Sequence, residues 1–412
     1  MNNIQSQKNI QKIPRLRFPE FSGKWEEKKL KDYLHEHKTR NINNEYTEVF
    51  SVAKEKGVIN QIEHLGRSYS AESLINYKVI FPDDIVYTKS PTANFPYGII
   101  KQNRTERSGV VSTLYAVYKP KNKYIGYLIH EYFLSWVHTY NYLVPLVQKG
   151  AKNTINIGNS EFLNGSILYL PSIEKEQQKI VSFLKISDEW TSILRKQKES
   201  LEEYKKGIMQ KIFSQEIRFK DDNGKNFPKW EEKKLGEILK ERKEYSTKGK
   251  GYPHISLTTQ GVVPKSKRYN RDFLVGDDEV KGYKITRLND LCYNPANLKF
   301  GVISINKLGA GIFSPIYVTF EIIGQNIDFV GYYLIRDEFI NKARRYEQGT
   351  VYERMAVSPA DFVKVKVAFP SLPEQQKIAD FLTSLDKAIE AKQQQITLAE
   401  NWRKGLTQGL FI

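Results

Sequence analysis

A long helical pattern occurs twice in this chain, and it constrains the fold more than any other feature. One copy begins at Ser371 and runs to residue 412 with Pro373 as its last proline. Ser371 and Glu374 match a capping box, and Pro373 lies in the first turn, where its missing N–H costs little. The other copy begins near Pro171, and the two align at a constant offset of 198 residues (374 − 176) over about forty positions.

Apolar residues recur along both copies at alternating steps of three and four. This spacing predicts an apolar seam that packs against another helix. At about 1.5 Å per residue, each helix would be roughly 60 Å long. The residues that we expect to pack between helices are Ile180, Leu184, Leu194, Leu201, Gly207 and Ile208 in one copy and Ile378, Leu382, Leu385, Ile389, Gly405 and Leu406 in the other.

Two of these residues are glycines at matching positions, Gly207 and Gly405. A glycine inside a helix costs about 1 kcal/mol relative to alanine, so its recurrence suggests a backbone that a neighbour approaches closely. We therefore expect the two helices to cross, or to pack antiparallel, near these positions, and leucine at both positions to destabilise the protein.

The region before each helix is also repeated. Trp25-Glu26-Glu27-Lys28-Lys29-Leu30 returns as Trp230-Glu231-Glu232-Lys233-Lys234-Leu235. Short β-branched and aromatic runs, broken by Gly, Pro and Asn, follow in both repeats and predict strands and turns. We predict an α+β fold with pseudo-two-fold symmetry. It has two tandem mixed α/β domains, each with a mixed sheet and a few short helices, and two long helices.

The predicted boundaries follow from the repeats. They are a tail over 1–16, a first globular domain over 17–171 and a first long helix over 172–214, then a second globular domain over 215–370 and a second long helix over 371–412. A chain of 412 residues is long enough for two or more domains.

The formal net charge of +17 indicates a polyanionic partner, and nucleic acid is the commonest one. The charge also suits RNA or an anionic membrane, but the long helices carry both signs of charge, which argues against a membrane-surface helix. The single cysteine, Cys292, excludes an internal disulfide and fits a reducing compartment. The sequence has no signal peptide and no apolar run of about 18 residues, so neither export nor a membrane span is expected.

The two repeats agree in framework positions, but their loops differ in length and sequence. The offset between matched positions falls from 205 (Trp25 to Trp230) to 198 at the long helices. Similar scaffolds with different loops are suited to binding two different ligands of the same general class. Together with the positive charge, this favours a protein that reads a two-part DNA site.

The motifs resemble those of the specificity (S) subunits of type I restriction-modification systems, of the kind found in low-GC Gram-positive bacteria. The resemblance rests on Pro14-Arg15-Leu16-Arg17-Phe18-Pro19 with the repeated Trp-Glu-Glu-Lys-Lys-Leu, and on the two helix openings, Glu176-Gln177-Gln178-Lys179-Ile180 and Pro373-Glu374-Gln375-Gln376-Lys377-Ile378. It covers nearly the whole chain. The first helix opening lacks the proline, which leaves the first residue of that helix open.

The resemblance implies that each globular domain is a target recognition domain, which reads half of a bipartite double-stranded DNA sequence through the major groove. It also implies that the long helices form an antiparallel coiled coil that sets the half-site spacing and docks two methyltransferase (M) subunits. Two motor-nuclease (R) subunits would complete the enzyme. S-adenosylmethionine, ATP and Mg would be bound by these partners, and this chain would be non-catalytic and bound to DNA in a bacterial cytoplasm. Because the loops of the two domains differ, we expect an asymmetric target.

Candidate DNA contacts are basic and amide residues near predicted turns, since Arg and Lys pair with guanine and Asn with adenine. They are Lys89, Asn94, Lys101, Asn103, Arg104 and Arg107 in the first domain and Lys265, Lys267, Arg268, Asn297 and Lys299 in the second. The alternative for each is an ordinary solvated surface residue.

No catalytic motif is convincing. The chain has no phosphate-binding loop ending in Gly-Lys-Ser or Gly-Lys-Thr. Asn294-Pro295-Ala296-Asn297 is faintly similar to an adenine methyltransferase motif, but we expect a turn there. The six histidines are scattered, and we expect no bound metal. The alternative functions are a self-contained DNA methyltransferase with its own specificity domains and a nucleic-acid-binding scaffold, including an RNA-binding one, outside restriction-modification.

Overall fold

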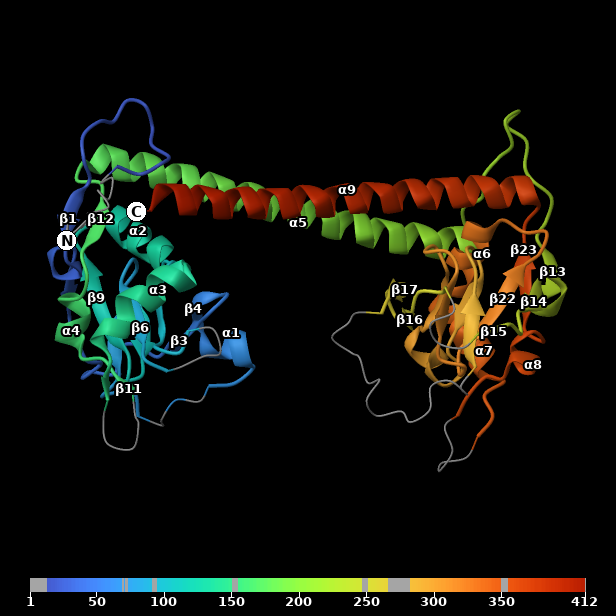
Figure 1. The fold of residues 1–412 in the computed structure, drawn as a ribbon, viewed down its shortest axis with the longest axis horizontal. Helices are drawn as coiled ribbons and strands as arrows, with labels where there is room; N and C mark the ends of the chain where they lie inside the picture. Colours follow the sequence, from blue (N-terminus) through green and yellow to red (C-terminus); the bar gives the residue numbers. More distant parts are fainter. Residues whose placement is uncertain are drawn as a thin grey trace, which may run out of the picture. The chain divides into compact units, whose positions relative to one another are not determined.

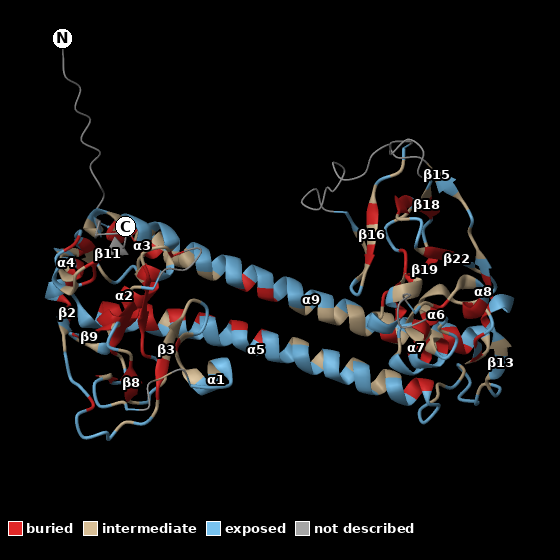
Figure 2. Ribbon diagram, turned by 90° about the horizontal axis from the view of Figure 1, so that it is seen from below, coloured by how far each residue is buried: buried red, intermediate tan, exposed pale blue. Residues whose placement is uncertain are grey.

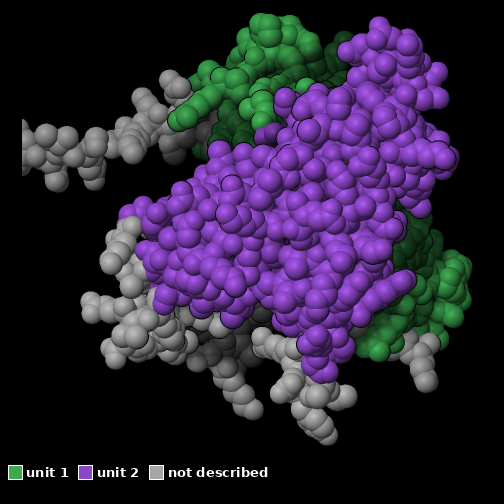
Figure 3. All heavy atoms as spheres, turned by 90° about the vertical axis from the view of Figure 1, so that its right-hand side faces the viewer, with its two compact units in different colours: residues 1–195, 394–412 green, residues 196–393 purple. Residues whose placement is uncertain are grey.

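A computed structural model describes residues 13–68, 70, 73–90, 95–149, 155–246, 251–265, 282–349 and 355–411 (Figure 1). The chain divides into two compact units (Figure 3). Unit 1 contains residues 1–195 and 394–412, and unit 2 contains residues 196–393. Each unit therefore combines one globular domain with parts of both long helices. The predicted tail over 1–16 lies mostly outside the described residues.

The globular part of unit 1 is built on a four-stranded sheet with the order β2-β9-β6-β7. Side chains along its central strands alternate between two apolar clusters: Ile85 and Tyr87 of β6 belong to the main core, and Val86 belongs to a smaller core on the other face. This period of two is what a strand buried on both faces requires. Tyr87 and Tyr118 stack on Phe162, which closes the main core.

The described elements of unit 1 occur in the following order. The strands are β1 (Glu26–Lys28), β2 (Leu34–Glu36), β3 (Phe50–Ala53), β4 (Gly57–Asn60), β5 (Lys78–Ile80), β6 (Ile85–Thr88), β7 (Ile99–Gln102), β8 (Gly109–Val111), β9 (Ala116–Pro120), β10 (Gln148–Lys149), β11 (Ile155–Asn156) and β12 (Leu168–Leu170). The helices are η1 (Leu30–Asp32), α1 (Gln61–Leu65), α2 (Lys123–Leu134), α3 (Trp136–Leu143), η2 (Val144–Leu146) and α4 (Asn159–Leu163).

Unit 2 repeats this plan. Its main sheet has the order β14-β22-β19-β20. A three-stranded sheet, β15-β18-β21, a hairpin, β16-β17, and a two-stranded sheet, β13-β23, accompany it. Its strands are β13 (Glu231–Lys234), β14 (Leu239–Glu241), β15 (Tyr245–Ser246), β16 (Ile255–Thr258), β17 (Gly261–Pro264), β18 (Tyr283–Thr286), β19 (Leu291–Tyr293), β20 (Ile303–Ile305), β21 (Gly311–Phe313), β22 (Val318–Ile322) and β23 (Lys366–Phe369). Its helices are η4 (Leu235–Glu237), η7 (Pro295–Phe300), α6 (Ile327–Leu334), α7 (Asp337–Arg344) and α8 (Pro359–Phe362).

The ladders between the described strands are antiparallel in both units, for example β6 with β9 and β19 with β22. A parallel component is limited to isolated bridges, Val49 to Val110 and His254 to Ile312. The predicted α+β class with tandem domains is confirmed, but the sheets are less mixed in strand direction than we predicted.

The two predicted long helices are α5 (Glu174–Phe213) and α9 (Leu372–Leu410), with 40 and 39 residues (Figure 1). In unit 1 the N-terminal half of α5 packs against the C-terminal part of α9, where Leu194 forms a small buried cluster with Ile396 and Ala399. In unit 2 Lys205, near the end of α5, bonds to Asp386 of α9 at 2.5 Å. The two helices therefore pair in antiparallel fashion, as the family resemblance implies.

The predicted seam residues have two roles. Ile180 and Leu184 are buried in the core of unit 1, and Ile378 and Leu382 in that of unit 2, so the beginning of each helix belongs to a globular core. Only Leu194, of the predicted seam, belongs to the small cluster shared by the two helices alone. The others, Leu201, Ile208, Leu385, Ile389 and Leu406, are half-buried. Between the two cores both helices are largely exposed (Figure 2).

The expectation of a close approach at the two helix glycines is wrong. Gly207 and Gly405 are exposed, and a Cβ added at either would meet no other atom within 4 Å. Their backbones therefore face open space, and nothing in the structure explains why glycine recurs there.

An ionic contact fixes the beginning of each long helix to the start of its own domain. Arg17 donates from Nε and Nη2 to the two carboxylate oxygens of Glu176 at 2.7 and 2.9 Å. Arg218 binds Glu374 in the same way at 3.0 and 2.6 Å. Both carboxylates are at most 1% exposed. Removing the arginine from such a buried, bidentate pair destabilises the fold strongly, because it leaves an uncompensated buried charge. The glutamate of each helix-opening motif is thus structural.

Candidate nucleic-acid interface

Two of the candidate contacts in unit 1 are buried. Asn103 is 1% exposed, and its Nδ2 donates to the carbonyl oxygens of Phe81 and Arg107, both at 2.9 Å. Its amide is therefore used inside a turn, and we withdraw Asn103 as a base contact. Lys101 is 5% exposed and lines a groove at strand β7. The sequence could not separate these two residues from their neighbours, because burial depends on strands far away in the chain.

The remaining described candidates of unit 1 lie closer to the surface. Arg104 contacts Glu131 at 2.9 Å and stacks on the ring of Tyr127 at 3.6 Å. Arg107 is 44% exposed and forms ion pairs with Glu48 and Glu63, which raise its pKa. Lys89 is half-buried, and burial lowers its pKa. As candidate DNA contacts, these three residues stay predictions.

In unit 2 the described candidates lie on the surface. Asn297 and Lys299 lie in η7 (Pro295–Phe300), which is capped by Asn294 at its start and by Gly301 at its end. The Asn294 side chain accepts from the backbone N–H groups of Ala296 and Asn297, and Gly301 adopts the left-handed conformation (φ 75°) that ends such a turn. Asn294-Pro295-Ala296-Asn297 is therefore the capped start of a 3₁₀ helix. Asn297, Lys299 and the neighbouring Phe300 are all exposed, a mixture that suits contact with bases and phosphates.

The other candidates of unit 2 are only partly covered by the structure. Lys265 is exposed directly after β17. Lys267 and Arg268 follow it and, like Asn94 of unit 1, lie outside the described residues. These three, with Lys265, Asn297 and Lys299, stay predictions.

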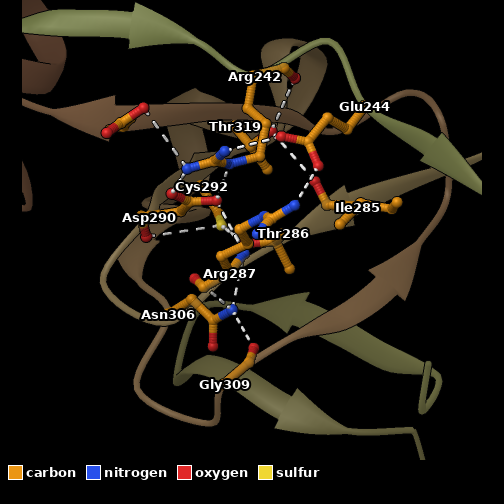
Figure 4. Close-up of polar contacts among 11 residues, drawn as sticks. Arg242, Glu244, Ile285, Thr286, Arg287, Asp290, Cys292, Asn306, Gly309 and Thr319 are labelled. Carbon is orange, nitrogen blue, oxygen red and sulfur yellow. Dashed lines mark hydrogen bonds and ion pairs between the residues drawn. The ribbon is translucent and has the colours of Figure 1, made fainter. Parts of the chain in front are cut away.

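A polar network holds the two loops that flank β19 and β20 in unit 2 (Figure 4). Arg242 donates from Nε and Nη2 to Asp290 at 2.8 and 3.0 Å and also reaches Glu244 at 2.9 Å. Asn306 donates to the carbonyl oxygens of Arg287 and Gly309 at 2.9 and 2.8 Å. The network rigidifies these loops, and burial raises the pKa of the neighbouring Cys292 to about 12, so its thiol stays protonated.

Unit 1 has a second polar cluster that the sequence did not reveal. Arg403, from the end of α9, donates to Asp188 of α5 at 2.7 Å and to Glu131 of α2 at 2.7 Å. Arg104 bonds to the other oxygen of Glu131. Each acid thus has an arginine partner, and the cluster joins both long helices to helix α2. Arg403 is 215 positions from Asp188 and 272 from Glu131, so local sequence patterns carry no signal for these contacts.

The comparisons with known proteins agree on one family. The family model described as the type I restriction modification DNA specificity domain matches residues 228–401. A relative from Methanocaldococcus jannaschii, the putative type I restriction enzyme MjaX specificity subunit, is 27% identical over 308 residues, which cover 69% of this chain and 67% of that protein.

Two solved structures share the fold over nearly its full length. The S subunit of a type I restriction-modification system from M. genitalium aligns with a TM-score of 0.52 and 14% identity, covering 97% of this chain and 99% of that one. A chain from a study of complex assembly and conformational transition of the type I R-M system aligns with a TM-score of 0.52 and 16% identity, covering 94% and 96%.

The class of protein follows from these matches and from the tandem units with their paired helices: residues 228–401 form a DNA specificity domain. Over about two thirds of its length the chain is similar to a specificity subunit of a type I restriction enzyme, and its fold is that of such subunits. Within the described residues, none of the helices is long and apolar enough to span a bilayer.

Proposed function

We propose that this chain reads an asymmetric, bipartite DNA sequence, with one half-site read by each globular domain. The observation that carries the proposal is that the two units have the same framework but different side chains at matched surface and loop positions. Half-sites on one face of B-DNA lie about 34–36 Å apart, or a multiple of that distance. A helix of 40 residues is roughly 60 Å long at 1.5 Å per residue, which is enough to bridge such a spacing.

Within unit 2 the proposed reading surface is η7 with Asn297, Lys299 and Phe300. An asparagine amide matches the hydrogen-bonding edge of adenine, a lysine pairs with guanine or phosphate, and an exposed aromatic ring packs on a base or sugar. In unit 1 the corresponding candidates are Arg104, Arg107 and Lys89. Phosphate contacts would supply affinity, and the contacts to base edges would supply sequence discrimination.

We further propose that the chain is itself non-catalytic and works with two methyltransferase subunits and two restriction subunits in the bacterial cytoplasm. S-adenosylmethionine, ATP and Mg would be bound by those partner subunits. An exposed apolar stripe on α5 supports docking: Ile186, Trp190 and Ile193 are 64%, 46% and 46% exposed and share one helix face. Large exposed apolar side chains of this kind commonly mark protein interfaces.

The test is to map methyladenine in the source genome with and without this gene, and then with Asn297→Ala and Lys299→Ala variants. We expect methylation at one asymmetric bipartite sequence that disappears with the gene. Asn297→Ala should relax one base position, and Lys299→Ala should weaken binding while leaving the sequence unchanged. A palindromic target, or methyl transfer by the isolated chain, would contradict the proposal.

A further inference from the structure

Unit 1 has a groove with a volume of about 1260 Å³. It runs along the edge strand β7 and is lined by the β3–β4 turn, helices α2 and α3, and the facing parts of α5 and α9. Its walls carry the cluster of Arg104, Glu131, Asp188 and Arg403. A cavity of this size with converging polar groups is the common form of a ligand site.

Lys101 is the unusual residue of this groove. Only 5% of its surface is exposed. Its ammonium nevertheless has no hydrogen bond, ion pair or aromatic partner within the described part of the chain. A buried lysine is almost always paired, because an uncompensated ammonium loses its hydration without a replacement. Burial is the main cause that lowers the pKa of Lys101 to about 8, and the nearby charge of Arg104 adds to it.

A second donor lines the same groove. His130 is 6% exposed, and its Nδ1 accepts from the backbone N–H of Gln102 at 2.8 Å. Burial, with the charges of Arg104, Lys101 and Arg403, lowers the pKa of His130 well below its usual value, so the ring is neutral and carries its proton on Nε2. That N–H has no partner among the described residues.

The acids of the groove are already satisfied. Glu131 is bonded by Arg104 and Arg403, and Asp188 by Arg403 and by the hydroxyl of Tyr127 at 3.3 Å. The other two acids of the lining, Glu55 and Glu400, pair with Lys54 and Arg195. The lining thus has four carboxylates, all paired, and six cations, which are Lys56, Lys101, Arg104, Arg195, Arg403 and Lys404. Among its groups without a partner in the described residues are the ammonium of Lys101, Nε2–H of His130 and Nδ1 of His138. This arrangement lacks an anion that accepts several hydrogen bonds.

Unit 2 does not have this site. The strand pairing places Val86 opposite Lys101 in unit 1 and Cys292 opposite Ser304 in unit 2, and Ser304 is therefore the counterpart of Lys101. The counterpart of Gln102 by the same strand pairing is Ile305. The donors are consequently a property of unit 1 and no requirement of the shared fold.

We infer that the groove of unit 1 binds a phosphate group, with the ammonium of Lys101 as its main ligand and the Nε2–H of His130 as a further donor. A phosphate offers several strong acceptor oxygens and up to two negative charges, which match these donors. A free nucleotide and a DNA strand would both supply it. If the phosphate belongs to a DNA strand, the inference rests on the proposed function. If it belongs to a free nucleotide, the inference is independent of the proposed function.

The experiment uses the full chain and measures affinity for inorganic phosphate, ADP and a target duplex by titration calorimetry at pH 7. Lys101→Ser installs the residue of unit 2, Lys101→Met keeps the apolar stem, and Lys119→Ser removes an exposed lysine of β9 in the same sheet as a matched control. We expect both Lys101 variants to weaken phosphate binding at least tenfold and Lys119→Ser to bind like the wild type.

The ligands then separate the two sources. Tighter binding of ADP than of phosphate, with unchanged duplex affinity in Lys101→Met, assigns the groove to a nucleotide. A loss of duplex affinity in Lys101→Met, with ADP no tighter than phosphate, assigns it to a DNA strand. Equal phosphate affinity of the wild type and Lys101→Met, or no phosphate binding by the wild type at millimolar concentration, would overturn the inference. Neither of these two results bears on the sequence preference for DNA, so the proposed function is tested separately by mapping methyladenine.

Discussion

Units 1 and 2 keep the same ionic contact at the start of their long helices but differ around it. In unit 1 Trp25 donates from Nε1 to Glu176 at 3.1 Å, in addition to Arg17. In unit 2 the matched Trp230 has a buried Nε1 with no partner among the described residues. The arginine–carboxylate pair is thus common to both units while its surroundings differ, since a buried carboxylate cannot lose its cation without a large cost.

The same contrast occurs at the loop end of the sheets. Asp84 in unit 1 bonds to His37 at 2.9 Å, and its counterpart Asp290 in unit 2 bonds to Arg242 through two hydrogen bonds. The carboxylate position is shared and its hydrogen-bond partner differs. The comparison teaches that the framework acids anchor both domains, while their partners and the groove residues distinguish one domain from the other.

The largest expected effect comes from breaking the shared contact. Glu176→Ala and Glu374→Ala each leave an arginine without its carboxylate, which should lower the free energy of unfolding by about 3–5 kcal/mol. Glu176→Ala should cost about 1 kcal/mol more, because Trp25 also loses its acceptor. Thermal and denaturant unfolding, followed by tryptophan fluorescence, measures both. The exposed Glu189 of α5 supplies a control, Glu189→Ala, and similar stability of all three variants would refute the role of the contact.

The second effect concerns Lys101, which unit 2 replaces with Ser304. Its pKa is lowered to about 8 in the folded protein and is near 10.5 when unfolded. Between these values the unfolded chain binds more protons, so this residue's contribution to stability rises with pH, and below pH 8 its burial costs about 3 kcal/mol. The charges that act on it are those of Arg104, Glu131, Glu55 and Lys54, and His130 is neutral throughout this range.

Lys101→Met should therefore be more stable than the wild type at pH 7 in phosphate-free buffer, and this advantage should shrink as the pH rises to 10. The difference between the two proteins cancels the titration of the buried tyrosines, which affects both alike. A difference that does not change with pH would show that Lys101 is not a buried charge.

Exchanging the partner of the carboxylate sharpens the comparison at the sheet ends. Arg242→His removes one of the two bonds to Asp290 and the bond to Glu244, and we expect a loss of about 1–3 kcal/mol. Arg287→Ala, which breaks an exposed ion pair with Glu244, should cost less than about 1 kcal/mol. Calorimetric unfolding compares the two, and an equal loss in both would mean that the buried network is no stronger than a surface pair.

The smallest effect is expected at the helix glycines. Because a Cβ at Gly207 or Gly405 meets open space, Gly207→Ala and Gly405→Ala should each stabilise the protein by up to about 1 kcal/mol. Circular dichroism melting of the single and double variants tests this. Destabilisation by either alanine would restore the idea of a close approach at these positions.

The sequence by itself determined the duplicated plan, the two long helices and the family resemblance. Pro373 marks the first turn of α9, which begins at Leu372, one residue after the predicted start. The predicted capping box is not formed, because the buried hydroxyl of Ser371 has no partner among the described residues and the carboxylate of Glu374 binds Arg218. The heptad-like spacing identified Leu194 as a helix–helix contact. Proline exclusion and apolar periodicity act over a few residues, so a chain can be read for them without coordinates.

The tertiary structure alone decided which polar residues are free to meet DNA. Asn103, Lys101 and Arg104 all lie near one predicted turn, yet Asn103 is held inside that turn and Lys101 is buried on strand β7. Glu176 meets Arg17 across 159 positions of sequence. Exposure and ion pairing depend on which distant segments pack together, and no local pattern records that. The groove with its unpaired lysine exists for the same reason: five separate segments of unit 1 converge on one edge strand.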